Sequence, residues 1–168
     1  MDADRFREMM SRFPTGVSVI TATDRAGTPH GATCSSLSSV TLVPPTLLVC
    51  LQVDGATVSA IQATRRFAVN LLRYDSRRVA KIFASPGADR FAEVEWRELS
   101  SSGLPYLHRD AFAVADCGVT HELVIGDHVV MAGVPSGIWL SPGVPLLYGS
   151  RRFSSWAPDH SLPEGMTT

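Results

Sequence analysis

The sequence predicts a mainly β domain with inserted short helices, built as an antiparallel barrel of about seven strands. Three observations predict this class. Short segments rich in β-branched residues recur along the chain, and turn-forming Gly, Pro and Asp residues separate them. No long helical pattern alternates with the segments, as a doubly wound sheet would require. The 168 residues, 45% of them hydrophobic, suffice for one domain with a sizeable core.

The first half of the chain carries clear strand signals at residues 16–23, 30–36, 46–53 and 66–72. Helices are predicted at residues 57–64 and 76–84, the second with Asp75 as its N-cap. Apolar residues near the N-terminus recur at helical spacing, which predicts a short amphipathic helix that packs them into the core. These residues are Phe6, Met9, Met10 and Phe13.

The second half predicts a less regular start and a long continuation of the sheet. Residues 88–107 are expected to be irregular with short strands at best, and residues 111–125 form a long strand or a strand pair. Further strands are expected at residues 128–134, 137–140 and 145–148. We assign residues 1–156 to one domain. Residues 157–168 combine Pro, Gly and polar residues, so we expect a flexible C-terminal tail there.

Composition and missing motifs exclude several function classes. The net charge of −1 argues against a nucleic-acid binder. No apolar run reaches the roughly 18 residues of a membrane span, and the charged N-terminal residues lack a signal-peptide pattern. Cys34, Cys50 and Cys117 are widely separated, which predicts free thiols in a reducing cytoplasm and no metal site. GxGxxG, P-loop, GxSxG and HExxH motifs are all absent, which argues against Rossmann-type, P-loop and hydrolase chemistry.

Three local patterns could carry chemistry, and each also has an interpretation without a functional role. Residues 33–41 hold six hydroxyls, which suit a phosphate or a polar ring edge but also an exposed Ser-rich loop. Asp127 and His128 could form a carboxylate-oriented imidazole or an exposed turn pair. Arg151 and Arg152 suit an anionic ligand, a dimer contact or a solvated surface. Lys81 is the only lysine, a bias that a GC-rich genome would also produce.

The order of the segments resembles that of the short-chain flavin reductases, the reductase components of two-component flavin monooxygenases. The resemblance spans roughly residues 6–153. The segments that carry it are PTGVSVIT (14–21), PHGAT (29–33), SSLSSVT (35–41), the prolines 44–45, FAVNLL (67–72), DRF (89–91), DC (116–117), GDH (126–128) and PLLY (145–148). The resemblance implies an FMN-binding split β-barrel of antiparallel Greek-key type, usually a homodimer with flavin near the subunit interface.

The resemblance also implies an activity and its partners. It implies NAD(P)H-dependent reduction of FAD or FMN by hydride transfer, with NADH a better candidate than NADPH. The reduced flavin would diffuse to a separate monooxygenase, in antibiotic or other secondary-metabolite biosynthesis or in aromatic degradation. Two alternatives stay open. One is a flavin-binding electron carrier or sensor without NADH turnover, and the other is a pyridoxamine-phosphate-oxidase-like oxidase or a non-flavin binding module.

Residue by residue, the resemblance implies a flavin and nicotinamide site. The residues expected to line the isoalloxazine ring are Thr33, Cys34, Ser35 and Ser36, with Leu51, Gln52 and Val53 passing it. Those expected near the ribityl chain and phosphate are Ser39, Thr41 and Thr57, and Arg90 and Phe91 match a pair near the flavin. His128 matches the histidine beside the nicotinamide, and Tyr148 and Arg152 match the region that closes the dinucleotide pocket.

The chain departs from the commoner family pattern at Cys34, Thr41 and the pair Asp54–Gly55, which leaves the choice between FAD and FMN open. Hydride transfer needs stacking and orientation and no protein nucleophile. The predicted roles are therefore positional. Main-chain N–H groups between Thr33 and Ser36 bond the polar edge of the ring, and His128 orients the nicotinamide.

Overall fold

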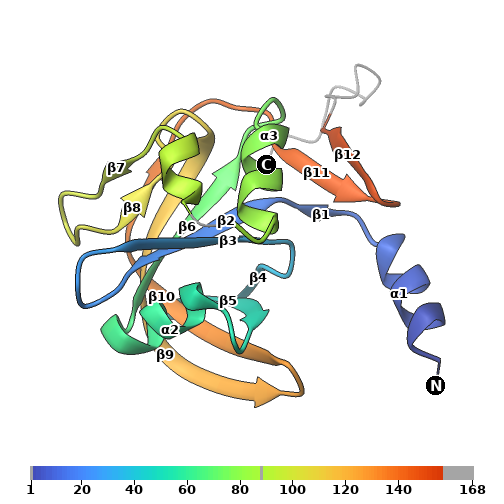
Figure 1. Ribbon diagram of the computed structural model, residues 1–168, viewed down its shortest axis with the longest axis horizontal. Coiled ribbons are helices and arrows are strands. Elements are labelled where there is room, and N and C mark those ends of the chain that lie inside the picture. Colours follow the sequence, from blue (N-terminus) through green and yellow to red (C-terminus); the bar gives the residue numbers. More distant parts are fainter. Residues whose placement is uncertain (1, 88, 157–168) are drawn as a thin grey trace.

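A computed structural model describes residues 2–87 and 89–156, so the expected tail at 157–168 lies outside the described residues. The main sheet has seven strands, all paired antiparallel, in the order β3-β2-β6-β9-β10-β5-β4 (Figure 1). These strands are β2 (Ser18–Thr23), β3 (Pro29–Cys34), β4 (Ser38–Leu42), β5 (Pro45–Gln52), β6 (Arg66–Leu72), β9 (Ala111–Ile125) and β10 (His128–Leu140).

Two small sheets and four helical segments complete the described fold. The small sheets are formed by β1 (Thr15–Gly16), β11 (Leu146–Gly149) and β12 (Arg152–Ser155), and by β7 (Arg97–Glu98) and β8 (Pro105–Tyr106). The helices are α1 (Ala3–Ser11), α2 (Ala56–Thr64), α3 (Arg77–Ala84) and the short 3-10 helix η1 (Arg90–Glu93). The expectation of a mainly β domain with inserted short helices is therefore confirmed.

The main sheet curls until β3 approaches β5, and no strand ladder joins these two among the described residues. Side chains bridge the gap instead. The Ser36 hydroxyl donates to the Cys50 carbonyl at 2.9 Å, beside the end of β3. The expected split barrel is consistent with this open seam, because a closed barrel would carry main-chain bonds there.

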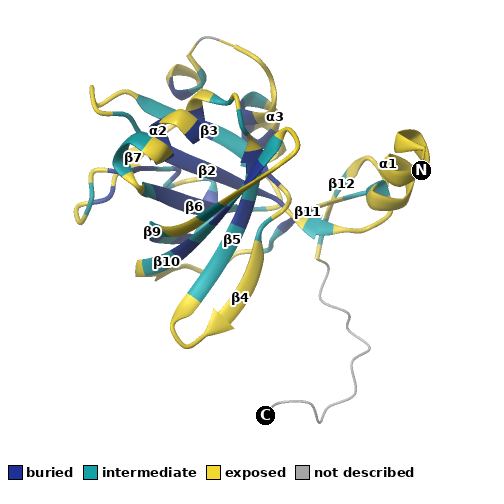
Figure 2. Ribbon diagram, turned by 90° about the horizontal axis from the view of Figure 1, so that it is seen from below, coloured by how far each residue is buried: buried dark blue, intermediate teal, exposed yellow. Residues whose placement is uncertain are grey.

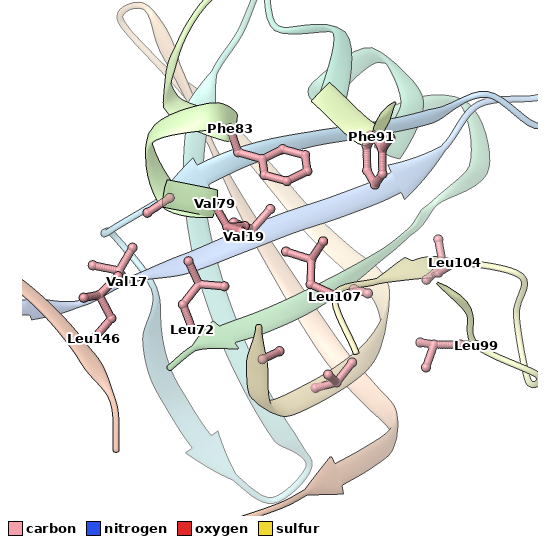
Figure 3. Close-up of a cluster of buried hydrophobic side chains, with 14 residues drawn as sticks. Val17, Val19, Leu72, Val79, Phe83, Phe91, Leu99, Leu104, Leu107 and Leu146 are labelled. Carbon is pink, nitrogen blue, oxygen red and sulfur yellow. The ribbon is translucent and has the colours of Figure 1, made fainter. Parts of the chain in front are cut away.

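Two hydrophobic clusters stabilise the barrel, and β2 contributes to both because its side chains alternate between its two faces. Val19 belongs to the cluster beneath α3 and η1, and Ile20 belongs to the cluster beneath α2. Figure 3 shows Phe83 from α3 and Phe91 from η1 on the same side of β2 as Val19. Both rings are buried, with centroids 5.1 Å apart in an edge-to-face arrangement. Each such side chain stabilises the fold by roughly 1.5–3 kcal/mol.

Two expectations about the helices are wrong. The apolar side chains of the N-terminal segment are exposed and do not face the core: Phe6 by 50%, Met9 by 58%, Met10 by 45% and Phe13 by 64%. Figure 2 shows α1 standing away from the barrel beside β11 and β12. Asp75 is also not the N-cap of α3, because that position belongs to Ser76. The hydroxyl of Ser76 bonds the Asp110 carbonyl at 3.3 Å.

After residue 110 the main sheet continues in two long, continuous strands. The possible strand pair at residues 111–125 is the single strand β9, and the two segments at 128–134 and 137–140 join into β10 across a register shift near Pro135. None of the described helices combines the length and apolar character needed to cross a membrane.

Candidate functional site

A cavity of about 1270 Å³ opens along the seam of the barrel. Its walls are β3, the end of β5 with the start of α2, and the helices α3 and η1. Tyr148 and Phe153 from the small C-terminal sheet reach one side of it. This volume exceeds the 300–1,000 Å³ of a usual small-ligand pocket. The cavity is therefore large enough for a ligand with two ring systems.

The floor of the cavity depends on a close approach of β3 to α3. A Cβ atom on Gly31 would lie 2.6 Å from the Phe83 ring, so only glycine fits there without displacing the ring. The Thr33 hydroxyl donates to the Ala80 carbonyl at 2.7 Å and fastens β3 to α3. Gly31 and Thr33 both line the cavity, so β3 forms one of its walls close to α3.

The start of α2 gives one end of the cavity an affinity for anions. Gly55 is the N-cap and has no side chain to bond the first N–H groups of the helix. Gly55, Ala56 and Thr57 all line the cavity, and Thr57 is almost fully buried. Free main-chain N–H groups and the helix dipole stabilise a phosphate at such a position.

Arg90 and Lys81 add positive charge at the α3 and η1 wall. One terminal nitrogen of Arg90, Nη1, donates to the Gly31 carbonyl at 2.7 Å. Its Nε is buried and has no hydrogen-bond partner within the described part of the chain. A buried donor without an acceptor is costly, so this nitrogen fits an acceptor atom of a bound ligand. The residues present therefore fit an anionic, ring-bearing group such as a flavin nucleotide.

His128 lies at the start of β10 on the rim of the cavity, and its Nδ1 is 2.8 Å from the Asp127 carboxylate. The hydrogen bond with His128 lowers the pKa of Asp127, so the carboxylate stays ionised at neutral pH. A donating Nδ1–H leaves Nε2 as the acceptor. Asp127 and His128 thus form a hydrogen-bonded pair at the rim of the cavity, and both side chains are exposed, so the role of this pair in the site stays a prediction.

A second such pair involves His30, which also lines the cavity. Its Nε2 lies 3.1 Å from the Asp24 carboxylate. The hydrogen bond with His30, followed by one from the Thr28 amide, lowers the pKa of Asp24. Local sequence patterns do not reveal this pair, because Asp24 is typical of a turn and His30 lies in a predicted strand, and neither pattern predicts that the two side chains meet.

The cavity brings together nine of the fifteen residues predicted for the site: Thr33, Ser35, Leu51, Gln52, Thr57, Arg90, Phe91, His128 and Tyr148. The other six do not line it: Cys34, Ser36, Ser39, Thr41, Val53 and Arg152. Alternation along the strands explains part of this division. Cys34 points into the core beneath α2, and Arg152 is exposed while its neighbour Phe153 lines the cavity. The proposed roles of these six residues remain predictions.

Several lining residues were not predicted. Lys81 lies on the predicted helix at residues 76–84 but belongs to no functional motif, and Trp96 lies in the stretch expected to be irregular. Phe153 belongs to the short strand β12, which the sequence did not predict. Across residues 2–87 and 89–156, no cluster of three or more His, Cys, Asp or Glu side chains could hold a metal ion.

Comparisons with known proteins agree with this geometry. The flavin reductase like domain family matches residues 10–157. The chain is 50% identical over 153 residues to a flavin reductase (NADPH) of Lentzea aerocolonigenes, covering 91% of this chain and 89% of the relative. It is 35% identical over 158 residues to the reductase component of a 4-nitrophenol 4-monooxygenase/4-nitrocatechol 2-monooxygenase of Rhodococcus opacus, covering 94% and 83%.

A solved structure of similar shape is that of the NADH:FAD oxidoreductase of Streptomyces globisporus C-1027 in complex with NAD and FAD fragments. It superposes with a TM-score of 0.88 at 31% identity, and the match covers 95% of each chain. The order of motifs, the split barrel and these matches over nearly the whole length lead to one conclusion: the chain belongs to the flavin reductase-like family.

Proposed function

We propose that this protein is an NAD(P)H-dependent flavin reductase that supplies reduced flavin to a separate monooxygenase. The observation that carries the proposal is the cavity of about 1270 Å³. It combines a wall formed by β3 with two positions that favour anions, at the start of α2 and at Arg90. Relatives named flavin reductase and reductase component support the same activity.

In this proposal the chain's residues bind and orient two ligands. A bound flavin supplies the hydride acceptor and a nicotinamide dinucleotide supplies the hydride. The first turn of α2, with Thr57, holds the phosphate of the flavin. Main-chain N–H groups between Thr33 and Ser36 bond the polar edge of the ring and stabilise negative charge there. His128, held by Asp127, orients the nicotinamide amide, and Phe91 and Tyr148 exclude water from the reacting rings.

The finer features of the function are also proposals. We propose NADH as the preferred donor, although relatives named for NADPH and for NADH both occur. FAD and FMN are both candidate flavins. We further propose a homodimer in the cytoplasm, with reduced flavin reaching the oxygenase by diffusion. The cytoplasmic location is supported by three free cysteines.

Steady-state turnover tests the proposal. Purified protein is mixed with NADH or NADPH and with FMN or FAD, and the loss of the reduced-nicotinamide absorbance is followed. We expect oxidation of the nicotinamide that depends on both the protein and added flavin. Tight flavin binding without turnover would instead favour an electron carrier or sensor. A colourless preparation that still turns over would identify the flavin as an exchangeable substrate.

A further inference from the structure

His30 lines the cavity, and the proposed function gives it no role. The turn between β2 and β3 holds its ring through the Asp24 carboxylate. One carboxylate oxygen, Oδ1, accepts from the main-chain N–H groups of Ala26 and Thr28, both at 2.9 Å, and the other, Oδ2, lies 3.1 Å from Nε2 of His30. Because Nε2 is engaged by Asp24, the second ring nitrogen, Nδ1, is the one left for a ligand.

The ring lies on the side of β3 that faces α2. Side chains alternate along a strand, so His30, Ala32 and Cys34 point to the same face of β3. Cys34 belongs to the hydrophobic cluster beneath α2, and Ala32 packs against that cluster. His30 therefore continues this row of side chains into the cavity.

The strand directions set His30 opposite the start of α2. Each neighbouring pair in the order β3-β2-β6-β9-β10-β5 is antiparallel, so β3 and β5 run in opposite directions across the open seam. At one end of the seam, Sγ of Cys34 lies 3.8 Å from the Cys50 carbonyl oxygen. Moving back along β3 to His30 thus corresponds to moving forward from Cys50 to Gly55, the N-cap of α2. Both His30 and Gly55 line the cavity, so they lie on facing sides of it.

The charges along this part of the cavity favour an anion. Lys81 and Arg90 line it, and Nη1 of Arg90 donates at 2.7 Å to the carbonyl of Gly31, the residue after His30. Asp89 is the carboxylate among the lining residues, and it is already engaged as the N-cap of η1. Together with the first N–H groups of α2, the two cations give this part of the cavity a positive balance of charge.

We propose that His30 selects flavins that carry a 5′-phosphate, with Nδ1 hydrogen-bonded to a phosphate oxygen on the side opposite the first turn of α2. This inference rests on the proposed function and deepens it, because it names a residue that distinguishes FMN from riboflavin. The second pKa of a phosphate monoester is about 6, so near neutral pH its oxygens are charged and share a proton readily with an imidazole nitrogen. Riboflavin has the same ring and ribityl chain without the phosphate, so it would gain nothing from this contact.

Equilibrium binding of the oxidised flavins tests this assignment without relying on turnover. Flavin fluorescence titrations compare FMN with riboflavin for wild type, His30→Gln and the control His121→Gln. Gln keeps an amide for Asp24 but places no nitrogen at Nδ1, whereas His121 is exposed on β9 and lies outside the cavity. We expect His30→Gln to weaken FMN binding by about tenfold, the loss of one hydrogen bond to a charged group, and to change riboflavin binding by less than about twofold.

The ratio of the FMN and riboflavin affinities decides the outcome. Unchanged FMN affinity in His30→Gln would overturn the proposal, as would an equal loss for both flavins, because His30 would then contact the ring or only shape the wall. Riboflavin affinity at the wild-type value, with weakened FMN binding, supports the proposal and shows that the variant is folded with its cavity intact. A wild type that binds neither flavin would overturn the proposed function itself, so the two failures can be told apart.

Discussion

At the scale of single residues, the pair formed by Asp127 and His128 carries the sharpest functional prediction. We expect His128→Ala to raise the KM for the nicotinamide or lower kcat, reducing activity about tenfold to a few hundredfold through lost orientation of the donor. His121→Ala is the matched control, because His121 is exposed on β9 and lies outside the cavity. An unchanged kcat/KM in His128→Ala would remove this histidine from the site.

The three free cysteines should differ in reactivity. Burial raises the pKa of Cys117 to about 12, and its side chain is fully buried. Cys34 is also buried, whereas Cys50 is partly exposed on the cavity wall. Because the thiolate is the reactive form, a native protein treated with a thiol reagent at neutral pH should label first at Cys50. Mass spectrometry of the labelled protein identifies which cysteine is modified first. Native labelling of Cys117 ahead of Cys50 would contradict the described core.

At the scale of the elements, a buried carboxylate joins β9 to β6. Burial of Asp116 alone would raise its pKa. Hydrogen bonds from Arg66 at 2.7 Å and Ser101 at 2.9 Å outweigh burial, so the pKa lies below the usual value. A carboxyl whose pKa falls on folding stabilises the protein above its unfolded pKa near 3.8, and this contribution is lost as pH falls through the folded pKa.

Replacement of that carboxylate should therefore destabilise the sheet. We expect Asp116→Asn to lower the free energy of unfolding at neutral pH by about 2–3 kcal/mol, since it leaves Arg66 without its partner. The variant should also lose less stability than wild type between neutral pH and pH values below the unfolded pKa. Urea denaturation measures both effects. Asp54→Asn, at an exposed turn, is the control, and equal losses in the two variants would contradict this account.

The contact between β3 and α3 makes a second prediction at this scale. We expect Gly31→Ala to push the Phe83 ring away from the cavity floor, destabilising the protein by about 1–3 kcal/mol and weakening flavin binding. Gly118→Ala is the control, because an added Cβ at that strand position meets nothing within 4 Å. Thermal unfolding and a flavin titration of the two variants test this prediction. Full stability of Gly31→Ala would mean that the floor is less tightly packed than described.

The same elements show what sequence could and could not predict. Strands such as β2 and β6 were predictable, because alternation and β-branched residues are local properties. The exposure of the apolar face of α1 was not predictable, since periodicity identifies an apolar face but does not say what covers it. His30 and Lys81 escaped notice for a similar reason: the curl of the sheet, not sequence proximity, brings β3, α3 and η1 around one cavity.

At the scale of the whole molecule, large apolar side chains remain exposed at several separate places. They include Phe13, Leu42, Val43, Leu140 and Trp156, each more than 60% exposed. The neighbouring residues Leu42 and Val43 expose apolar surface that a second copy of the chain would cover, which supports the predicted homodimer. Size-exclusion chromatography with light scattering should give twice the chain mass of 18.1 kDa. A single-chain mass at micromolar concentration would contradict the homodimer.

In the proposed reaction, one cavity brings a flavin and a nicotinamide together for hydride transfer. Anaerobic mixing tests it most directly, because without oxygen any reduced flavin accumulates. Protein with FMN or FAD is mixed with NADH or NADPH, and the visible flavin absorbance is followed. The account predicts rapid bleaching with at least one pair, far faster than without protein and strongly slowed by His128→Ala. Flavin that stays oxidised with every donor, despite binding to the protein, would contradict the account.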